Sequence, residues 1–340
     1  MIIKKIITSV FLIILISGCN NNSLQNRFEE EATGGIYVAS WNLENLFDTS
    51  DDPLKNDEDF LPSGENEWTE ERLKIKMENL ARVIKYMNDG KGPDVLGVQE
   101  VENKNVLEEL LKYLPDRSYK IGYLESPDNR GIDNGIIYDT DIFKLKGLSG
   151  DYVFLDDGYP TRLILRADLN FNNINLHFFI NHFPSRRGGA EESEPDRIAA
   201  AETLRKSIDR IMCEDSSAKI IVMGDFNDEP ENASIKKALG SKKFECENNS
   251  GSDFYNLSYK TYEDGLGSYM FRQDWNMLDQ IIISEEMADK YICGTFKIEK
   301  PDFMITKTGY YSGSARPTFG GRKYLGGFSD HFPVSARFDF

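Results

Sequence analysis

Polar residues that could bind a cation or move a proton lie at the ends of six apolar runs in this sequence. They are Asn42 and Glu44, Gln99 and Glu100, Asn181 and His182, Asp225 and Asn227, Asp279, and Asp330 with His331. Ligand-binding and catalytic groups commonly lie where strands leave a sheet. Each residue taken alone has a structural explanation, such as a turn, a helix cap or a solvated strand end. Because carboxylate, amide or histidine residues lie at the ends of all six apolar runs, we expect them to form one shared site.

The chemistry that these residue types favour is metal-assisted hydrolysis of a phosphate ester. Carboxylate and amide oxygens suit a hard cation, and Mg²⁺ needs only one or two carboxylates because it keeps several waters. Phosphodiester hydrolysis needs such a cation to neutralise the phosphoryl oxygens, and it needs a positioned water. A histidine paired with an aspartate keeps its imidazole oriented. We expect Mg²⁺ or Mn²⁺, with Ca²⁺ as a further candidate, and either Asp225 or His331 as the proton acceptor.

The loop that follows His182 carries positive charge in an acidic chain. Residues Asn181–Gly189 read NHFPSRRGG, which places Ser185, Arg186 and Arg187 just after one of only three histidines. Donors of this kind suit a phosphate group, and the two glycines let the backbone approach it closely. Pairing of the arginines with the glutamates that follow is the alternative.

Two further arginines are weaker candidates for binding phosphate. Arg130 lies in the stretch DNRGIDN and Arg162 in TRLILR, where an ion-pair or framework role is the favoured interpretation. His177 lies on the opposite strand face from Phe178 by alternation, so we expect it to be structural.

Apolar periodicity predicts alternating strands and helices. The predicted strands are residues 35–43, 94–101, 134–139, 161–170, 174–183, 219–226, 278–284 and 331–340, and the predicted helices are 69–88, 195–212 and 232–239. The succession of strands from residue 134 to 183 suggests an antiparallel run, so the fold class is α/β with partly antiparallel sheets. The acidic segment 48–68 lacks the glycine turn and closing glutamate of a calcium loop, and we expect a solvated loop there.

The first 34 residues are expected to lie outside the folded domain. A basic start and an apolar run of 11 residues precede Gly18 and Cys19, and this run is too short to span a bilayer. The pattern resembles the lipobox of bacterial lipoproteins, which predicts a signal peptide at 1–18, a lipidated Cys19 and a tether at 19–34. We therefore expect attachment to a membrane of the bacterial cell envelope, periplasmic or outer-membrane. An ordinary secretory signal is the alternative.

Composition limits the partners of the remaining chain, residues 35–340, which we interpret as a single domain. The formal net charge of −17 argues against a broad basic face that binds nucleic acid nonspecifically. It does not exclude a polyanionic substrate, because a cation and a few arginines can reverse the field inside one cleft. Cys213, Cys246 and Cys293 form no C-x-x-C pair, and we expect buried free thiols, with one disulfide as the alternative. No protein partner can be inferred.

The order of the motifs resembles the endonuclease/exonuclease/phosphatase superfamily, which includes deoxyribonuclease-I-like enzymes. The motifs are W-N-x-E-N, Q-E, N-H-x-x-S-R, G-D-F-N-D, L-D-x-I-I and S-D-H, and the resemblance covers residues 35 to 340. It implies a four-layer α/β sandwich, in which two mixed, mostly antiparallel sheets pack face to face with helices outside.

The resemblance also implies roles for individual residues. Glu100 would be the principal metal ligand, supported by Asn42, Glu44 and Asp330. Asp225 and Asn227 would orient the attacking water and the phosphoryl oxygens. His331, polarised by Asp279, would act as acid or base, and His182 would be the second histidine of the deoxyribonuclease-like branch.

One local signal bears on the substrate. The span from Phe303 to Ser329 has no acidic residue and mixes cations with aromatic side chains. This composition suits a nucleic acid strand, a lipid head group or a sugar phosphate, and a loop without a ligand is the structural alternative. We expect a metal-dependent phosphodiesterase of nuclease type. The alternatives are a lipid or inositol phosphate phosphoesterase and a surface lipoprotein that only binds, which the intact set of carboxylates and histidines disfavours.

Overall fold

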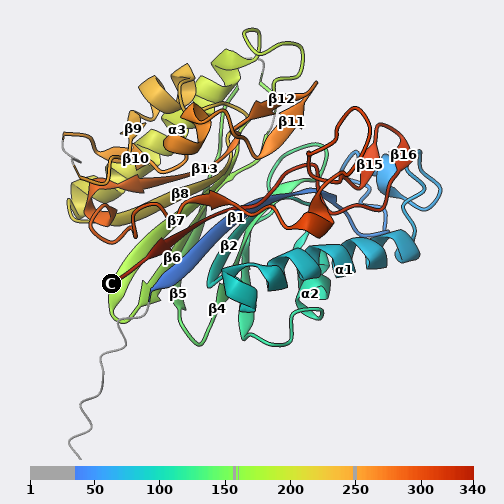
Figure 1. The fold of residues 1–340 in the computed structure, drawn as a ribbon, viewed down its shortest axis with the longest axis horizontal. Coiled ribbons are helices and arrows are strands. Elements are labelled where there is room, and N and C mark those ends of the chain that lie inside the picture. The colour runs from blue at the N-terminus through green and yellow to red at the C-terminus, as the bar shows by residue number, and fades with distance from the viewer. Residues whose placement is uncertain (1–34, 156–157, 160, 248–250) are drawn as a thin grey trace, which may run out of the picture. The chain divides into compact units, whose positions relative to one another are not determined.

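Two β-sheets dominate the computed structural model, which describes residues 35–155, 158–159, 161–247 and 251–340 (Figure 1). In spatial order the first sheet contains β14 (Lys297–Ile298), β17 (Val334–Phe338), β1 (Ile36–Leu46), β2 (Val95–Val101), β4 (Asp133–Asp139) and β3 (Tyr119–Tyr123). The second contains β5 (Lys144–Asp151), β6 (Ile164–Phe171), β7 (Ile174–His182), β8 (Lys219–Asp225), β13 (Asp279–Ser284), β10 (Phe254–Asn256) and β9 (Ser241–Lys243). The pairs β1–β2, β7–β8 and β9–β10 are parallel and the other pairs are antiparallel.

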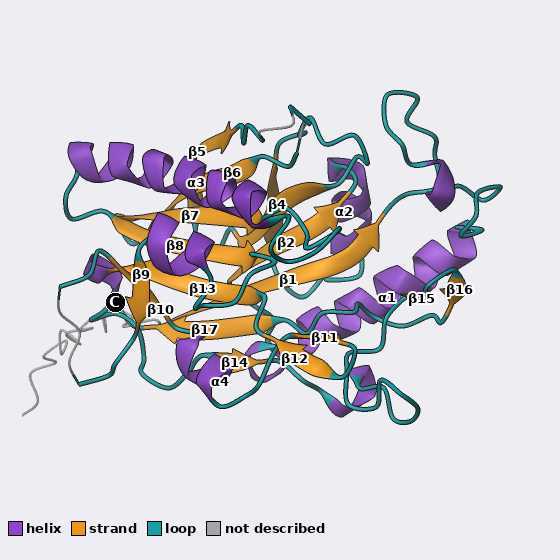
Figure 2. Cartoon of the chain, turned by 90° about the horizontal axis from the view of Figure 1, so that it is seen from above, coloured by secondary structure: helices purple, strands orange, loops and turns teal. Residues whose placement is uncertain are grey.

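Helices cover the outer faces of both sheets, which confirms the predicted four-layer sandwich (Figure 2). Helices α1 (Glu70–Tyr86) and α2 (Lys104–Leu111) pack on the first sheet, and α3 (Glu194–Glu214) packs on the second. A third apolar cluster joins the inner faces of the two sheets. At Gly97 of β2 an added Cβ would lie 2.9 Å from Met223 of β8, so glycine permits the close approach of the sheets there.

Short elements complete the described chain. They are α4 (Tyr259–Glu263), the hairpins β11 (Tyr269–Phe271) with β12 (Asp274–Asn276) and β15 (Phe319–Gly320) with β16 (Lys323–Tyr324), and the helical turns Glu58–Phe60, Asn88–Gly90, Ser234–Ala238, Glu285–Met287 and Asp302–Met304. The predicted helix at 232–239 is wrong in kind, because Ser234–Ala238 is a single π-helical turn. The sequence prediction also omitted α2.

The predicted antiparallel run from residue 134 to 183 is correct only in part. Strands β6 and β7 pair antiparallel in the second sheet, but β4 lies in the first sheet between β2 and β3. Strand β5, which was not predicted, occupies the edge beside β6. Alternation could not reveal this change of sheet, because both sheets bury one face in the same core.

The expectation of buried free thiols is also wrong. A disulfide joins Cys246 to Cys293, whose Cα atoms lie 5.8 Å apart, and Cys213 is free and exposed. In the acidic segment 48–68 the positions are exposed or half-buried except for Asp57 and Trp68, which are buried.

Residues Gly34–Phe340 form one compact unit. The predicted signal peptide, Cys19 and the tether lie outside the described residues. Within the described ranges, no helix is both long enough and apolar enough to cross a membrane.

Candidate active site

The ends of β1, β2, β7, β8 and β13 bring the predicted polar residues to one edge of the sandwich. Across the parallel pair β7–β8, His182 is the partner of Asp225, and Asp225 in turn faces Asp279 across β8–β13. The segment before β17 is tied to β1, because the Ser329 hydroxyl donates to the Asn42 carbonyl and the Trp41 indole donates to the His331 carbonyl. Five strands and one loop therefore contribute to a single site.

Three of these residues adopt the left-handed backbone conformation, which residues other than glycine rarely adopt. The φ angles of Glu44, Glu100 and Asn227 are 52°, 59° and 49°. The register of β1 against β2 shifts between Asn42 and Leu46, and that of β2 against β4 shifts around Glu100. Bulges and left-handed residues redirect side chains and are frequent at functional sites, where surrounding structure must hold them.

Gly224 permits the close contact that positions Asp225. Its φ angle is 145°, and an added Cβ would lie 2.0 Å from the Asn181 carbonyl oxygen on β7. The G-D pair of the sequence thus has a steric cause, because only glycine lets the two strands meet directly beneath the carboxylate.

Asn42 links two carboxylates of the site. Its Nδ2 donates to Glu100 Oε1 at 3.2 Å and to Asp225 Oδ2 at 3.0 Å. The Asn45 amide donates to Glu100 Oε2 at 2.9 Å, which fixes the second oxygen of that carboxylate. Asp330 accepts no hydrogen bond from the described residues. Burial raises the pKa of Asp330 to about 7, with Glu44 and Glu100 adding to the effect.

Glu44 organises the segment before Asp330, and its predicted role as a metal ligand stays a prediction. Its two carboxylate oxygens accept from the backbone amides of Thr318 and Phe319, at 2.5 and 3.1 Å. Behind it lies Lys76, whose Nζ is 3.8 Å from Glu44 Oε2 and donates to Thr318 Oγ1 and the Phe328 carbonyl. Glu44 therefore anchors the segment before Asp330, since both of its oxygens are already held.

His331 and Asp279 form a buried pair. Their Nδ1 and Oδ2 atoms lie 2.7 Å apart, and the ring of Tyr269 stacks on the imidazole with centroids 4.7 Å apart. Burial opposes the charge on His331, but carboxylates, with Asp279 first among them, raise its pKa well above the usual range. The other ring nitrogen, Nε2, is 3.9 Å from Asp225 Oδ2. The imidazole is thus protonated at neutral pH and directed at Asp225.

His182 has the opposite electrostatic character. Burial, and after it Arg162 and Arg130, lower its pKa well below the usual range, so the ring is neutral. Its Nε2 lies 3.6 Å from Asp225 Oδ2 and 3.8 Å from Glu100 Oε1. The two site histidines therefore differ in charge at neutral pH, which gives the site one proton donor and one neutral hydrogen-bonding ring.

Asp225 and Asn227 form the floor of the site. The Asn227 amide donates to Asp225 Oδ1 at 2.9 Å, and Asn227 Nδ2 donates to the Phe183 carbonyl at 3.0 Å. Burial raises the pKa of Asp225 to about 6, against the lowering effect of His331. At pH 7 Asp225 is therefore mostly ionised and able to accept a proton.

The predicted phosphate-binding residues separate into two groups. Arg130, Ser185, Arg186 and Arg187 line the same cavity as the carboxylates and histidines. Arg162 does not: it is buried and binds Asp128 at 3.2 Å and the Phe183 carbonyl at 2.7 Å, which agrees with the framework role that the sequence favoured over phosphate binding. It supports the backbone after His182 instead.

Arg186 and Arg187 also differ from each other. Arg186 donates to the Asn227 carbonyl at 2.7 Å and to the side chains of Asn276 and Asn232. Arg187 is exposed and forms no ion pair with the described residues, so the alternative pairing with the following glutamates is absent there. His177 pairs with Asp168 at 2.6 Å outside the cavity, as a structural residue would.

The cavity at this edge, which we call the site cleft, has a volume of about 690 Å³. Its lining combines Glu100, Asp225 and Asp330, His182 and His331, Ser185, Arg130, Arg186, Arg187 and Arg272, Asn227 and Asn276, and Gly189, Ala190, Tyr269, Phe271 and Leu278. Carboxylates, histidines and arginines that face one cavity suit a phosphate ester with a cation.

Two places in this region offer metal ligands. Asp225, Asp279 and His331 each present one ligand atom within 4.8 Å of the others. Because His331 holds a proton on the atom that faces Asp279, this group suits proton transfer better than metal binding. Among the described residues, no lysine or arginine forms a salt bridge with Glu100 or Asp330, and their carboxylates match the oxygen donors that a hard cation needs.

Sequence reasoning missed three residues of the site. Lys76 lies three residues after Leu73 and four before Leu80, a spacing that places it on the buried face of α1 and was available in the sequence. Tyr269 and Phe271 belong to the hairpin β11–β12, whose short strands gave no periodic signal.

The sequence model of the Endonuclease/Exonuclease/phosphatase family matches residues 37–339. The chain belongs to this family. The family name covers nucleases and phosphatases, which both hydrolyse phosphate esters. No curated protein sequence matched the chain.

Solved structures resemble the fold at low sequence identity. An endonuclease/exonuclease/phosphatase family protein from Bacteroides thetaiotaomicron is 16% identical with a TM-score of 0.58, over 90% of this chain and 98% of that one. A mannosyl-6-phosphatase from the same organism is 18% identical, TM-score 0.55, over 90% and 100%. The human Nocturnin catalytic domain, solved with a bound sulfate, is 19% identical, TM-score 0.53, over 90% and 94%. These similarities support the fold.

Proposed function

We propose that the protein is a divalent-metal-dependent phosphodiesterase and, within that class, a nuclease. The observation that carries the proposal is the meeting of Glu100, Asp225 and His331 in one cleft with exposed Arg187. The family match supports the class of reaction, and the cationic, acid-free segment before Asp330 supports a nucleic acid substrate.

The residues present fit a Mg²⁺ or Mn²⁺ ion. Glu100 and Asp330 would hold it, with Asn42 orienting Glu100. Burial, with Glu44 and Glu100 adding to its effect, raises the pKa of Asp330, and a bound cation would stabilise the ionised carboxylate. When bound, the ion neutralises charge on the phosphoryl oxygens.

The chain's own groups divide the proton transfers. Asp225, held by Asn42 and Asn227, accepts a proton from the attacking water, whose oxygen forms a bond to phosphorus. The bond from phosphorus to the ester oxygen breaks, and His331 donates the proton that lets this oxygen leave as a hydroxyl. His182 and Arg187 stabilise the phosphoryl oxygens by hydrogen bonds. The raised pKa of His331 supports this order, in which Asp225 and not His331 is the first proton acceptor.

A substrate panel tests this proposal. Single-stranded DNA, duplex DNA and RNA are incubated with Mg²⁺ or with chelator, using wild type and Glu100→Gln. We expect cleavage of nucleic acid by wild type with Mg²⁺ only. Intact nucleic acids beside rapid turnover of another phosphate ester refute the nuclease assignment but not the hydrolase class.

A second candidate is a phosphatase that acts on a sugar, inositol or lipid phosphate. The similarity to a mannosyl-6-phosphatase over its whole chain favours including this class. Mannose 6-phosphate, an inositol phosphate and sphingomyelin therefore belong in the same panel, with released phosphate or head group as the readout.

We also propose that a lipid on Cys19 anchors the enzyme outside the cytoplasm. The lipobox-like sequence supports this, and so does the Cys246–Cys293 disulfide, because such bonds persist in oxidising compartments. Mass spectrometry of the mature protein should find an acylated cysteine at position 19. An unmodified N-terminus at any position refutes the anchor.

A further inference from the structure

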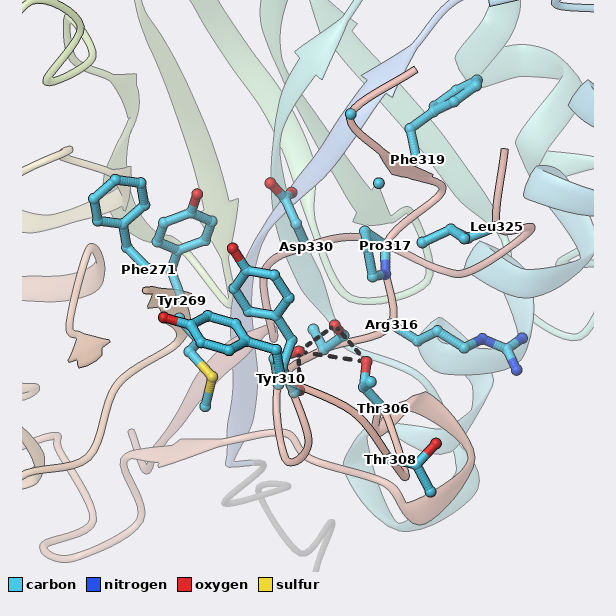
Figure 3. A pocket seen from close by; sticks show the side chains of 16 residues that line it. Tyr269, Phe271, Thr306, Thr308, Tyr310, Arg316, Pro317, Phe319, Leu325 and Asp330 are labelled. Atoms are coloured by element: carbon cyan, nitrogen blue, oxygen red, sulfur yellow. Dashed lines mark hydrogen bonds between the residues drawn. The ribbon is translucent and has the colours of Figure 1, made fainter. Parts of the chain in front are cut away.

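A second cavity opens beside the site cleft and has not been assigned a role above. We call it the aromatic cavity; its volume is about 550 Å³. It is lined by Tyr269, Met270, Phe271, Thr306, Thr308, Tyr310, Tyr311, Ser314, Ala315, Arg316, Pro317, Phe319, Gly320, Gly321, Leu325 and Asp330. Figure 3 shows Tyr269 and Phe271 on one side, Pro317 and Leu325 on the other, and Asp330 between them.

The two cavities adjoin each other and share part of their lining. Tyr269, Phe271 and Asp330 line both. Tyr269 also stacks on His331, so one ring separates the proposed proton donor from the aromatic cavity. A group that fills the aromatic cavity can therefore be covalently attached to a phosphate in the site cleft.

The walls of the aromatic cavity suit a flat, apolar ring. Phe271, Tyr310 and Tyr311 are exposed by 52%, 59% and 48%, and the two tyrosine rings meet nearly at right angles. Exposed aromatic surface of this kind favours stacking with a ring. Gln273 Nε2 donates to the Tyr310 carbonyl, which ties the hairpin β11–β12 to the opposite wall.

Two of the wall hydroxyls are already bonded and are not free to bind a sugar. The hydroxyls of Thr306 and Ser314 are bonded to each other and to backbone carbonyls. Asp330 is the one carboxylate in the lining. A polyol loses free energy when its hydroxyls are buried without partners, whereas the faces of a nucleobase need only stacking.

Positive charge near the aromatic cavity complements a polyanionic strand. Arg316 lines the cavity and Lys307 lies between the lining residues Thr306 and Thr308 in the chain; both are exposed and form no ion pair with the described residues. Cations beside an aromatic surface are the combination that binds the backbone and bases of single strands.

From these observations we propose that the aromatic cavity holds one unstacked nucleobase next to the scissile phosphate. The proposal rests on the nuclease function proposed above and adds that the strand must be unpaired at that nucleotide. A base inside a duplex has no free face to stack there, so single strands or frayed ends are the preferred substrates.

The test uses single-stranded oligonucleotides with one abasic residue at a defined position, and cleavage is mapped at each phosphate. Base stacking contributes roughly 1–3 kcal/mol, so cleavage beside the abasic residue should be about 5- to 150-fold slower than at matched positions. In the double variant Tyr310→Ala/Tyr311→Ala this preference should fall below about 3-fold. Phe154→Ala, an exposed aromatic residue between β5 and β6, is the matched control and should keep the preference.

The outcomes separate this inference from the function on which it depends. Equal cleavage beside abasic and normal residues, or an unchanged preference in the double variant, overturns the base subsite and leaves the nuclease intact. Intact strands under all conditions, with turnover of mannose 6-phosphate or sphingomyelin, overturn both the subsite and the nuclease.

Discussion

Replacement of Asp279 by asparagine tests the division of labour within the site. In the structure, His331 Nδ1 lies 2.7 Å from Asp279 Oδ2. The asparagine of Asp279→Asn has nearly the same shape and can still accept a hydrogen bond from Nδ1, but it lacks the negative charge of the aspartate. Because Asp279 is the first of the carboxylates that raise the pKa of His331, this pKa should fall toward its usual range.

The size of the effect follows from the proton that His331 donates. General acid catalysis contributes roughly 10²–10⁴-fold, so kcat at pH 8 should fall by about that factor. At lower pH more of the imidazole is protonated, and part of the activity should return. The alkaline limb of the pH profile therefore moves to lower pH in the variant, while Asp225, with a pKa of about 6, keeps setting the acid limb.

The assay is cleavage of a single-stranded DNA oligonucleotide, whose alkoxide leaving group needs the proton from His331, with saturating Mg²⁺ across a range of pH. The chain offers a matched control in Asp168→Asn, because Asp168 pairs with His177 at 2.6 Å on β6 and β7, outside the cleft. The control should behave as wild type. If Asp279→Asn retains wild-type kcat and an unshifted alkaline limb, the assignment of His331 as proton donor is refuted.

Three further predictions concern stability and metal. In chelator, Asp330 binds a proton more tightly in the folded protein than in the unfolded chain, so its ionisation destabilises the fold as pH rises from about 4 through 7. The free energy of unfolding of Asp330→Asn, measured by urea denaturation, should therefore exceed that of wild type by about 1–2 kcal/mol at pH 8 and not at pH 4.5. Lys76→Met should lose about 3–5 kcal/mol, since it leaves Glu44 buried without its cation, whereas exposed Lys74→Met should lose under about 0.5 kcal/mol. Gly224→Ala should lower the thermal midpoint far more than Gly265→Ala, because Gly265 also has a positive φ, of 73°, but an added Cβ would meet no atom within 4 Å there.

Each of these predictions has a contradicting result. Equal stability of Asp330→Asn and wild type at both pH values means that Asp330 carries no uncompensated charge. A Lys76→Met protein as stable as Lys74→Met means that the buried ammonium is dispensable. Equal midpoints for the two alanine variants mean that β7 and β8 can separate at Gly224 without cost.

Much of the site could be predicted because it depends on local rules. A polar residue that ends an apolar strand is visible in the sequence, and Asp225 after Gly224 or His331 after Asp330 shows it plainly. The parallel pairs β1–β2 and β7–β8 then bring these ends together. The site residues meet because of the order of the strands in the two sheets, and the order of the motifs in the sequence implied that arrangement through its family resemblance.

The remainder depended on contacts between distant segments. Glu44 is in the predicted motif, yet its oxygens are held by the amides of residues 318 and 319, a contact 274 residues away that no local pattern reports. Arg162 carries the right charge, but Asp128 draws it into the framework. Lys76, in contrast, could have been predicted from the sequence, because its helical spacing places it on the buried face of α1. A buried lysine is rare, so this position indicates a nearby carboxylate partner.

Mn²⁺ binding followed by electron paramagnetic resonance tests the central claim most directly, namely that Glu100 and Asp330 hold the cation while Asp279 and His331 move the proton. We expect one site in wild type, an affinity at least about 10-fold weaker in Glu100→Gln, and an affinity within about 3-fold of wild type in Asp279→Asn. Loss of Mn²⁺ binding in Asp279→Asn, with full binding in Glu100→Gln, would place the metal on the Asp225–Asp279–His331 group and contradict this account.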